Sequence, residues 1–215
     1  MRNLAALTTM TLFLMLSLTL AVSPAFGDTQ AATFNNLTGE ALANGPFTLG
    51  WQFTVNSPIT VTKLEAFDSS QDGLFESHDV GIWNSTGSLL VSATIAAGTV
   101  DALINQFRVK PVTPTLLAAG TYNIGAVWLD GADPNTFPGD LSNFATAPQI
   151  TFVDPAYIGG ATLADPVNIF SDAPAYFGPN LAYVTPEPSA ILLLGISLFV
   201  TGGMSFGRHY TKRQK

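Results

Sequence analysis

The sequence has no cysteine, and its long middle part has very few positively charged residues. The absence of cysteine excludes disulfides, thiol catalysis and cysteine-ligated zinc sites. Between residues 28 and 187 only Lys63, Arg108 and Lys110 are cationic, against all 15 acidic residues, which gives a net charge of −12. Nucleic acids and anionic lipid surfaces repel such a segment, whereas cations are attracted to it. We therefore expect no nucleic-acid partner.

The middle of the chain also lacks helical periodicity, and its apolar residues alternate with polar ones instead. Alternation of this kind is typical of strands with one buried face. Short strands with frequent turns predict an all-β fold, an antiparallel β-sandwich, with a small barrel as the alternative. Strong strand patterns lie at residues 47–55, 89–95 and 122–128, and weaker ones at residues 59–67, 80–83, 107–112, 150–153 and 181–184.

Two connecting segments have the composition of turns or loops. Residues 84–87 read Asn-Ser-Thr-Gly and predict a hairpin turn. Residues 130–164 are rich in proline, aspartate, glycine and asparagine, and we expect a long loop with little regular structure there.

The first 27 residues have the features of a secretory signal peptide. Arg2 precedes an apolar stretch at residues 4–22, and a small-x-small site at residues 25–27 precedes Asp28. We expect export by the Sec machinery and removal of residues 1–27 by signal peptidase, with an N-terminal membrane anchor as the alternative. Residues 28–184 are then one extracellular domain, long enough to form a core without disulfides.

The C-terminal part, residues 185–215, contains a second apolar run. Pro186, Glu187 and Pro188 precede 18 uncharged residues at 189–206. At about 1.5 Å per helical residue these reach about 27 Å, which is enough to cross a bilayer. Positive charges follow this run and are expected to stay cytoplasmic, which leaves the preceding domain outside. These charges are Arg208, Lys212, Arg213 and Lys215.

A Pro-Glu-Pro tripeptide, an apolar helix and a basic end resemble the PEP-CTERM sorting signal. The resemblance implies processing by a membrane-bound exosortase, which cuts the protein from its anchor. It also implies a Gram-negative-type bacterium, an inner-membrane intermediate and a final place at the cell surface or in the medium. A permanently anchored single-pass membrane protein is the alternative.

The middle of the chain carries a second resemblance. Residues 47–128 look like a domain that recurs in PEP-CTERM proteins and are similar to the uncharacterised DUF4082-like β-sandwich modules of bacterial surface proteins. The segments that carry this likeness are residues 49–53, 59–64, 72–83, 87–95 and 119–126. The resemblance implies no catalytic residues.

A 12-residue acidic loop between two predicted strands has the ligand spacing of a calcium loop. Numbered from the first residue, oxygen side chains fall at positions 1, 3, 5, 9 and 12, and Gly73 falls at the turn position 6. Position 7 offers a backbone carbonyl, and Phe75 at position 8 is expected to pin the loop to the core. The same residues also suit an acidic, solvated turn. The predicted Ca²⁺ ligands are Asp68, Ser70, Asp72, Leu74, Glu76 and Asp79.

Other candidate residues are fewer. His78 is the only histidine between the two apolar ends, and we expect a hydrogen-bonded residue that orders the acidic loop, with a general base or a surface ligand as the alternative. A second acidic group, Asp130, Asp133 and Asp140, is either a further cation site or ordinary loop chemistry. No Gly-x-Ser-x-Gly elbow is present.

The three tryptophans are candidates for stacking on sugar rings. By alternation, Trp51 and Trp128 face inward, whereas Trp83 follows Ile82 and is expected to be exposed, which makes it the candidate carbohydrate contact. Aromatic residues of the predicted loops are alternatives, namely Phe137, Tyr157, Tyr176 and Phe177.

These observations favour an exported surface or extracellular-matrix protein that is not an enzyme and that binds exopolysaccharide or neighbouring surface molecules. A calcium-dependent extracellular hydrolase is the alternative, with His78 or a carboxylate in its site.

Overall fold

The structure is a computed structural model that describes residues 27–34, 36–37, 45–129, 133–134, 141–169 and 178–185. These residues form an all-β fold in which every strand pair is antiparallel. Within them, no helix is long and apolar enough to span a membrane. The predicted signal peptide and the predicted C-terminal helix lie outside the described residues.

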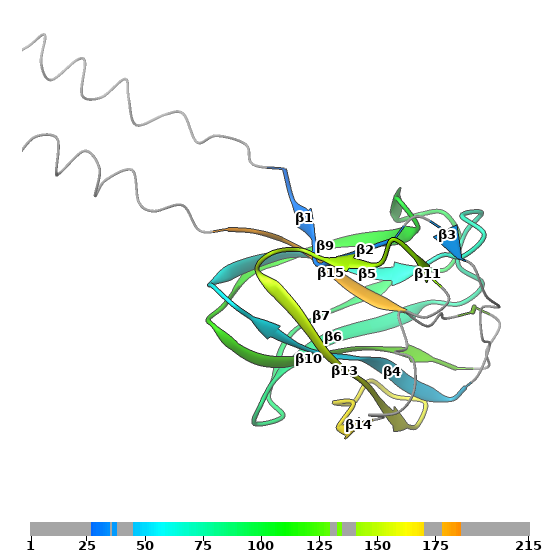
Figure 1. The fold of residues 1–215 in the computed structure, drawn as a ribbon. Helices are drawn as coiled ribbons and strands as arrows, with labels where there is room; N and C mark the ends of the chain where they lie inside the picture. Colours follow the sequence, from blue (N-terminus) through cyan, green and yellow to red (C-terminus); the bar gives the residue numbers. More distant parts are fainter. Residues whose placement is uncertain are drawn as a thin grey trace, which may run out of the picture.

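Two large sheets form two layers, with β5, β9 and β15 in the upper layer of Figure 1 and β4, β6, β10 and β13 in the lower one. The arrangement agrees with the predicted sandwich. The five-stranded sheet has the order β1 (Thr29–Gln30), β15 (Pro179–Val184), β5 (Ile59–Phe67), β9 (Phe107–Leu117) and β8 (Ala102–Ile104). The six-stranded sheet has the order β14 (Asn168–Ile169), β13 (Ile150–Gly159), β4 (Phe47–Val55), β10 (Gly120–Trp128), β6 (His78–Asn84) and β7 (Leu89–Ile95). Two short pairs complete the fold, β3 (Asn36–Leu37) with β11 (Leu141–Ser142) and β2 (Ala32–Thr33) with β12 (Ala145–Thr146).

The core lies between the two large sheets and follows the alternation of the sequence. Trp51 and Phe53 of β4 are fully buried, as are Ile124 and Trp128 of β10. They belong to one apolar cluster with residues of β5 such as Leu64. The inward position predicted for Trp51 and Trp128 is therefore confirmed.

The turn between β6 and β7 is also confirmed. Asn84 accepts a hydrogen bond from the backbone N–H of Gly87 (2.9 Å), and its side-chain Oδ1 accepts from the N–H groups of Thr86 and Ser88 (3.0 and 2.9 Å). Gly87 has a φ of 77°, which glycine adopts without strain. The Asn84 side chain thus fixes the hairpin conformation.

The expectation of a long irregular segment at residues 130–164 is wrong in its second half, because β13 extends through Gly159. Its proline and aspartate residues suggested a loop. However, Pro155 follows a register shift between Phe152 and Asp154. On the other side of β13, β14 pairs with only two of its residues, so β13 lies close to the edge of the sheet. Bulges and edges are the places where a sheet tolerates proline.

A row of small residues crosses the outer face of the six-stranded sheet. Gly81, Gly125 and Gly50 are paired neighbours on β6, β10 and β4. A Cβ atom at Gly125 would lie 3.1 Å from Pro166, and one at Gly81 would lie 3.2 Å from Leu163. The segment after β13 therefore lies close against this row and covers part of the outer face.

The outer face of the five-stranded sheet is covered as well. Phe34 contacts Phe67 and Phe107, with ring centroids 5.6 and 5.5 Å apart, and the three form a second small apolar cluster. Asn180 binds the backbone of Ala32 through both its amide oxygen (3.1 Å) and its amide nitrogen (2.9 Å). The N-terminal segment is thus fastened across this sheet.

Candidate functional site

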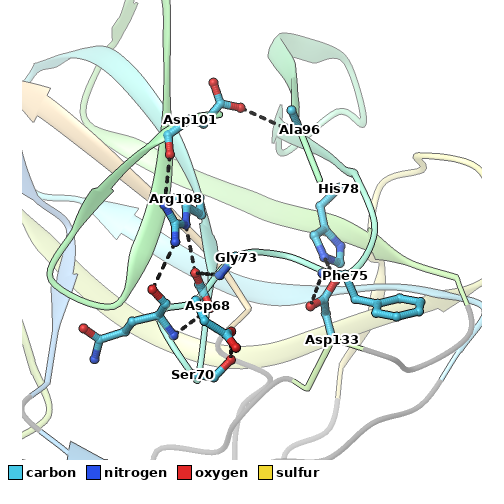
Figure 2. Close-up of polar contacts among 11 residues, drawn as sticks. Asp68, Ser70, Gly73, Phe75, His78, Ala96, Asp101, Arg108 and Asp133 are labelled. Atoms are coloured by element: carbon cyan, nitrogen blue, oxygen red, sulfur yellow. Dashed lines mark hydrogen bonds and ion pairs between the residues drawn. The ribbon is translucent and has the colours of Figure 1, made fainter. Parts of the chain in front are cut away.

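The acidic loop that follows β5 is built around a buried ion pair. Asp68 is 2 % exposed, and its Oδ2 accepts a hydrogen bond from the Arg108 Nε (2.8 Å) (Figure 2). Its two oxygens also accept from the backbone N–H groups of Gln71 (2.8 Å) and Gly73 (3.0 Å). Asp68 therefore stabilises the turn, and its oxygens are already engaged by N–H donors.

The other predicted calcium ligands make separate contacts. The Leu74 carbonyl accepts from the N–H of Gly98 (2.7 Å), Glu76 Oε1 accepts from the N–H of Leu129 (2.8 Å), and Asp79 accepts from the hydroxyl of Thr94 (2.5 Å). Ser70 and Asp72 are exposed and bond only to each other among the contacts of the described residues.

Arg108 and four backbone N–H groups thus bond to three of the predicted ligands, Asp68, Leu74 and Glu76. The calcium site stays a prediction. The role predicted for Phe75 is wrong, since its side chain is 74 % exposed and points away from the loop (Figure 2).

The same loop contributes to a second cluster, formed by Glu76, His78 and Asp133. A ligand atom of each lies within 4.8 Å of the others. His78 is fully buried; its Nδ1 lies 2.7 Å from the Val127 carbonyl oxygen and its Nε2 lies 3.1 Å from Asp133 Oδ2. The expectation of a hydrogen-bonded histidine is confirmed.

Asp133 contacts both of the other residues of this cluster. Its carboxylate also accepts hydrogen bonds from the backbone N–H groups of Phe75 and Glu76, both 2.8 Å long. Burial raises the pKa of Asp133, but the bonds from His78 and from the two N–H groups outweigh it and hold the pKa below its usual range. Of the second acidic group predicted from the sequence, Asp130 and Asp140 lie outside the described residues.

The prediction that Trp83 is exposed is wrong, since only 4 % of its surface is accessible. Its side chain does point away from the core, as the alternation requires. However, Trp83 and Leu89 lie near the glycine position 81 together with Leu163, which belongs to the segment that follows β13. Among the alternative aromatics, Tyr157 packs against Phe47, with ring centroids 6.4 Å apart. Phe137, Tyr176 and Phe177 lie outside the described residues.

A polar cleft of about 400 Å³ opens on the outer face of the six-stranded sheet, between that sheet, the β6–β7 hairpin and the segment leading to β14. Gln52 donates to Asn123 Oδ1 (3.2 Å), and Asn123 donates to Asp165 Oδ1 (2.8 Å). Among the hydrogen bonds of the described residues, Gln52 Oε1 and Asp165 Oδ2 accept none. The cleft thus combines fixed amide groups with acceptor oxygens that remain available.

One wall of the cleft is apolar. Val167 and Ile169 line it and are 58 % and 42 % exposed. Asn84 and Thr86 of the β6–β7 hairpin also line the cleft. A ligand with hydroxyl groups on its edges and C–H groups on its faces matches such a lining.

Sequence reasoning missed this cleft. The only available signal was that Gln52 and Asn123 occupy outward positions of two predicted strands. The strand order that makes them neighbours, with Asp165 opposite them, is not visible in the sequence.

All three cations of the described residues are held in ion pairs. No basic patch remains on this part of the surface to attract a polyanion. The pairs are Lys63 with Asp28 (2.7 Å), Arg108 with Asp68 (2.8 Å) and Lys110 with Asp101 (2.8 Å).

No family model matches the chain, and neither a curated protein nor a solved structure matches it. The resemblances to the PEP-CTERM signal and to the DUF4082-like modules therefore remain predictions from the residues that carry them.

Proposed function

We propose that this protein is an exported, non-catalytic surface or matrix component that binds exopolysaccharide in the cleft on the six-stranded sheet. The observation that carries the proposal is the chain of hydrogen bonds through Gln52, Asn123 and Asp165. It fixes the amide groups before any ligand arrives, so little side-chain entropy is lost on binding. Its remaining acceptor oxygens suit sugar hydroxyl groups.

The size and lining of the cleft support a short stretch of sugar chain. About 400 Å³ lies in the usual range of small-ligand sites. The apolar surface of Val167 and Ile169 offers contact to the C–H faces of a sugar ring. Since the described part has no unpaired cation, an uncharged or cation-bearing polymer fits better than a polyanionic one.

A binding measurement with one variant and one matched control tests the cleft. We expect Asp165→Ala to weaken binding of a neutral exopolysaccharide by about 10-fold or more, because it removes a charged acceptor and releases Asn123. Thr54→Ala, one outward position beyond Gln52 on β4, is expected to leave binding unchanged. The measurement is retention on a glycan array followed by titration calorimetry. Equal affinity for both variants would place the ligand elsewhere.

The absence of catalysis is tested in the same experiment. Retention of intact polymer without new reducing ends is expected, and the appearance of new reducing ends would favour the hydrolase alternative instead.

The proposed route to the surface begins with Sec export and signal peptidase and ends with exosortase, which acts on the motif at Pro186, Glu187 and Pro188 in the membrane-bound intermediate. Mass spectrometry of the mature protein is expected to find a C-terminus upstream of Arg208. A mature chain that still ends at Lys215 would instead support the permanently anchored form.

A further inference from the structure

The cluster of Glu76, His78 and Asp133 contains a pairing that needs a cation. The Val127 carbonyl can only accept, so His78 Nδ1 carries a proton and donates it over 2.7 Å. Asp133 Oδ2 lies 3.1 Å from the other ring nitrogen, Nε2. If the ring is neutral, two lone pairs face each other at this distance inside the protein. A proton or a metal ion between them removes that conflict.

The net charge of the cluster distinguishes these two cations. With a proton on Nε2, one imidazolium faces two carboxylates, so the cluster carries a charge of −1. With a divalent ion and a neutral ring, the charge is zero. His78 is fully buried and Asp133 is only 6 % exposed, whereas Glu76 is partly exposed, so a divalent ion neutralises a cluster in which two of the three members are shielded from water.

The geometry also suits a metal. Two ligand atoms at about 2.1 Å from a tetrahedrally coordinated ion are about 3.4 Å apart. The Nε2 to Oδ2 separation of 3.1 Å is close to that spacing, and one ligand atom from each of the three residues lies within 4.8 Å of the others. The hydrogen bond from Nδ1 to a backbone carbonyl is the arrangement that orients metal-binding histidines.

We propose that Glu76, His78 and Asp133 bind one divalent transition-metal ion of the Zn²⁺ type. One imidazole nitrogen and two carboxylates favour such an ion over Ca²⁺, which takes oxygen ligands. On binding, the proton of His78 Nε2 passes to solvent and the nitrogen lone pair coordinates the ion. The ion then links the start of β6 to Asp133. This site is separate from the polar cleft, since none of its three residues lines the cleft.

The test is titration calorimetry of the full chain, purified in mild detergent and treated with chelator, using ZnCl₂, MnCl₂ and CaCl₂ as separate probes. We expect one Zn²⁺ per chain and a higher melting temperature. Runs in two buffers of different ionisation enthalpy are expected to show release of about one proton per ion.

Glu76→Gln is the informative variant. Its amide oxygen can still accept from the N–H of Leu129, so the chelator-treated variant is expected to melt like the original protein. Its Zn²⁺ affinity is expected to fall at least 10-fold. Asp79→Asn is the matched control, because Asp79 is exposed and contacts only Thr94 among the described residues, and its Zn²⁺ affinity is expected to stay unchanged. Absence of Zn²⁺ binding, equal affinity in Glu76→Gln, or preference for Ca²⁺ would each overturn the proposal.

Discussion

Replacement of Asp68 by alanine is expected to lower the free energy of unfolding by about 3–5 kcal/mol. The change leaves the guanidinium of Arg108, which is 5 % exposed, without its carboxylate partner. It also removes the acceptors for the N–H groups of Gln71 and Gly73. Urea denaturation of both proteins measures the difference.

A double variant separates the two contributions. In Asp68→Ala with Arg108→Met the buried charge is gone, so we expect part of the lost stability to return. Asp72→Ala is the matched control within the same loop, and its exposed side chain predicts a change within about 0.5 kcal/mol. An Asp68→Ala protein as stable as the original would show that the ion pair does not hold the loop.

The second large effect is a dependence of stability on pH through Glu65. Its side chain is fully buried, and burial raises its pKa from 4.5 to about 7, against the lowering effects of Gln30, Lys63 and Asn180. In the unfolded chain the group titrates near 4.5. The stabilising contribution is therefore fully present below pH 4.5 and is lost as the pH rises through about 7. The loss amounts to about 3 kcal/mol.

Glu65→Gln imitates the protonated state at every pH. We expect this variant to lack the Glu65 share of the decline between pH 5 and pH 8 and to be the more stable protein at pH 8. Denaturation midpoints at several pH values check this, with Asp72→Asn as a control that keeps the original slope. If the Glu65→Gln protein declines as steeply as the original, the carboxyl group is not the source.

The strands were predictable because alternation reports which face of a strand is apolar. The pattern at residues 47–55 and the turn after Asn84 needed no tertiary information. The same reasoning failed for Trp83, and it could not reveal that Glu65 is buried. Alternation tells which side chains point away from the core, but not whether another segment covers them. The segment after β13 covers Trp83, and the N-terminal segment covers Glu65.

The candidate sites were harder to predict because distant residues form them. Asp68 and Arg108 are 40 positions apart in the sequence, and His78 and Asp133 are 55 positions apart. The acidic loop has the spacing of a calcium site. That spacing does not reveal that the carboxylate at its first position, Asp68, binds Arg108 of another strand. The polar cleft likewise joins Asn123 to a residue 42 positions later.

On the proposed export route, the pairing of the two-residue strand β1 with β15 makes the exact site of leader removal matter. Thr29 and Gln30 are paired with Tyr183 and Ala182. Cleavage a few residues further along the chain would remove β1 from the sheet. The backbone N–H and C=O groups of β15 that pair with β1 would then be exposed. Such an uncovered margin invites strand addition from another molecule. On that proposed route, we expect inaccurate cleavage to favour association of the mature molecules edge to edge.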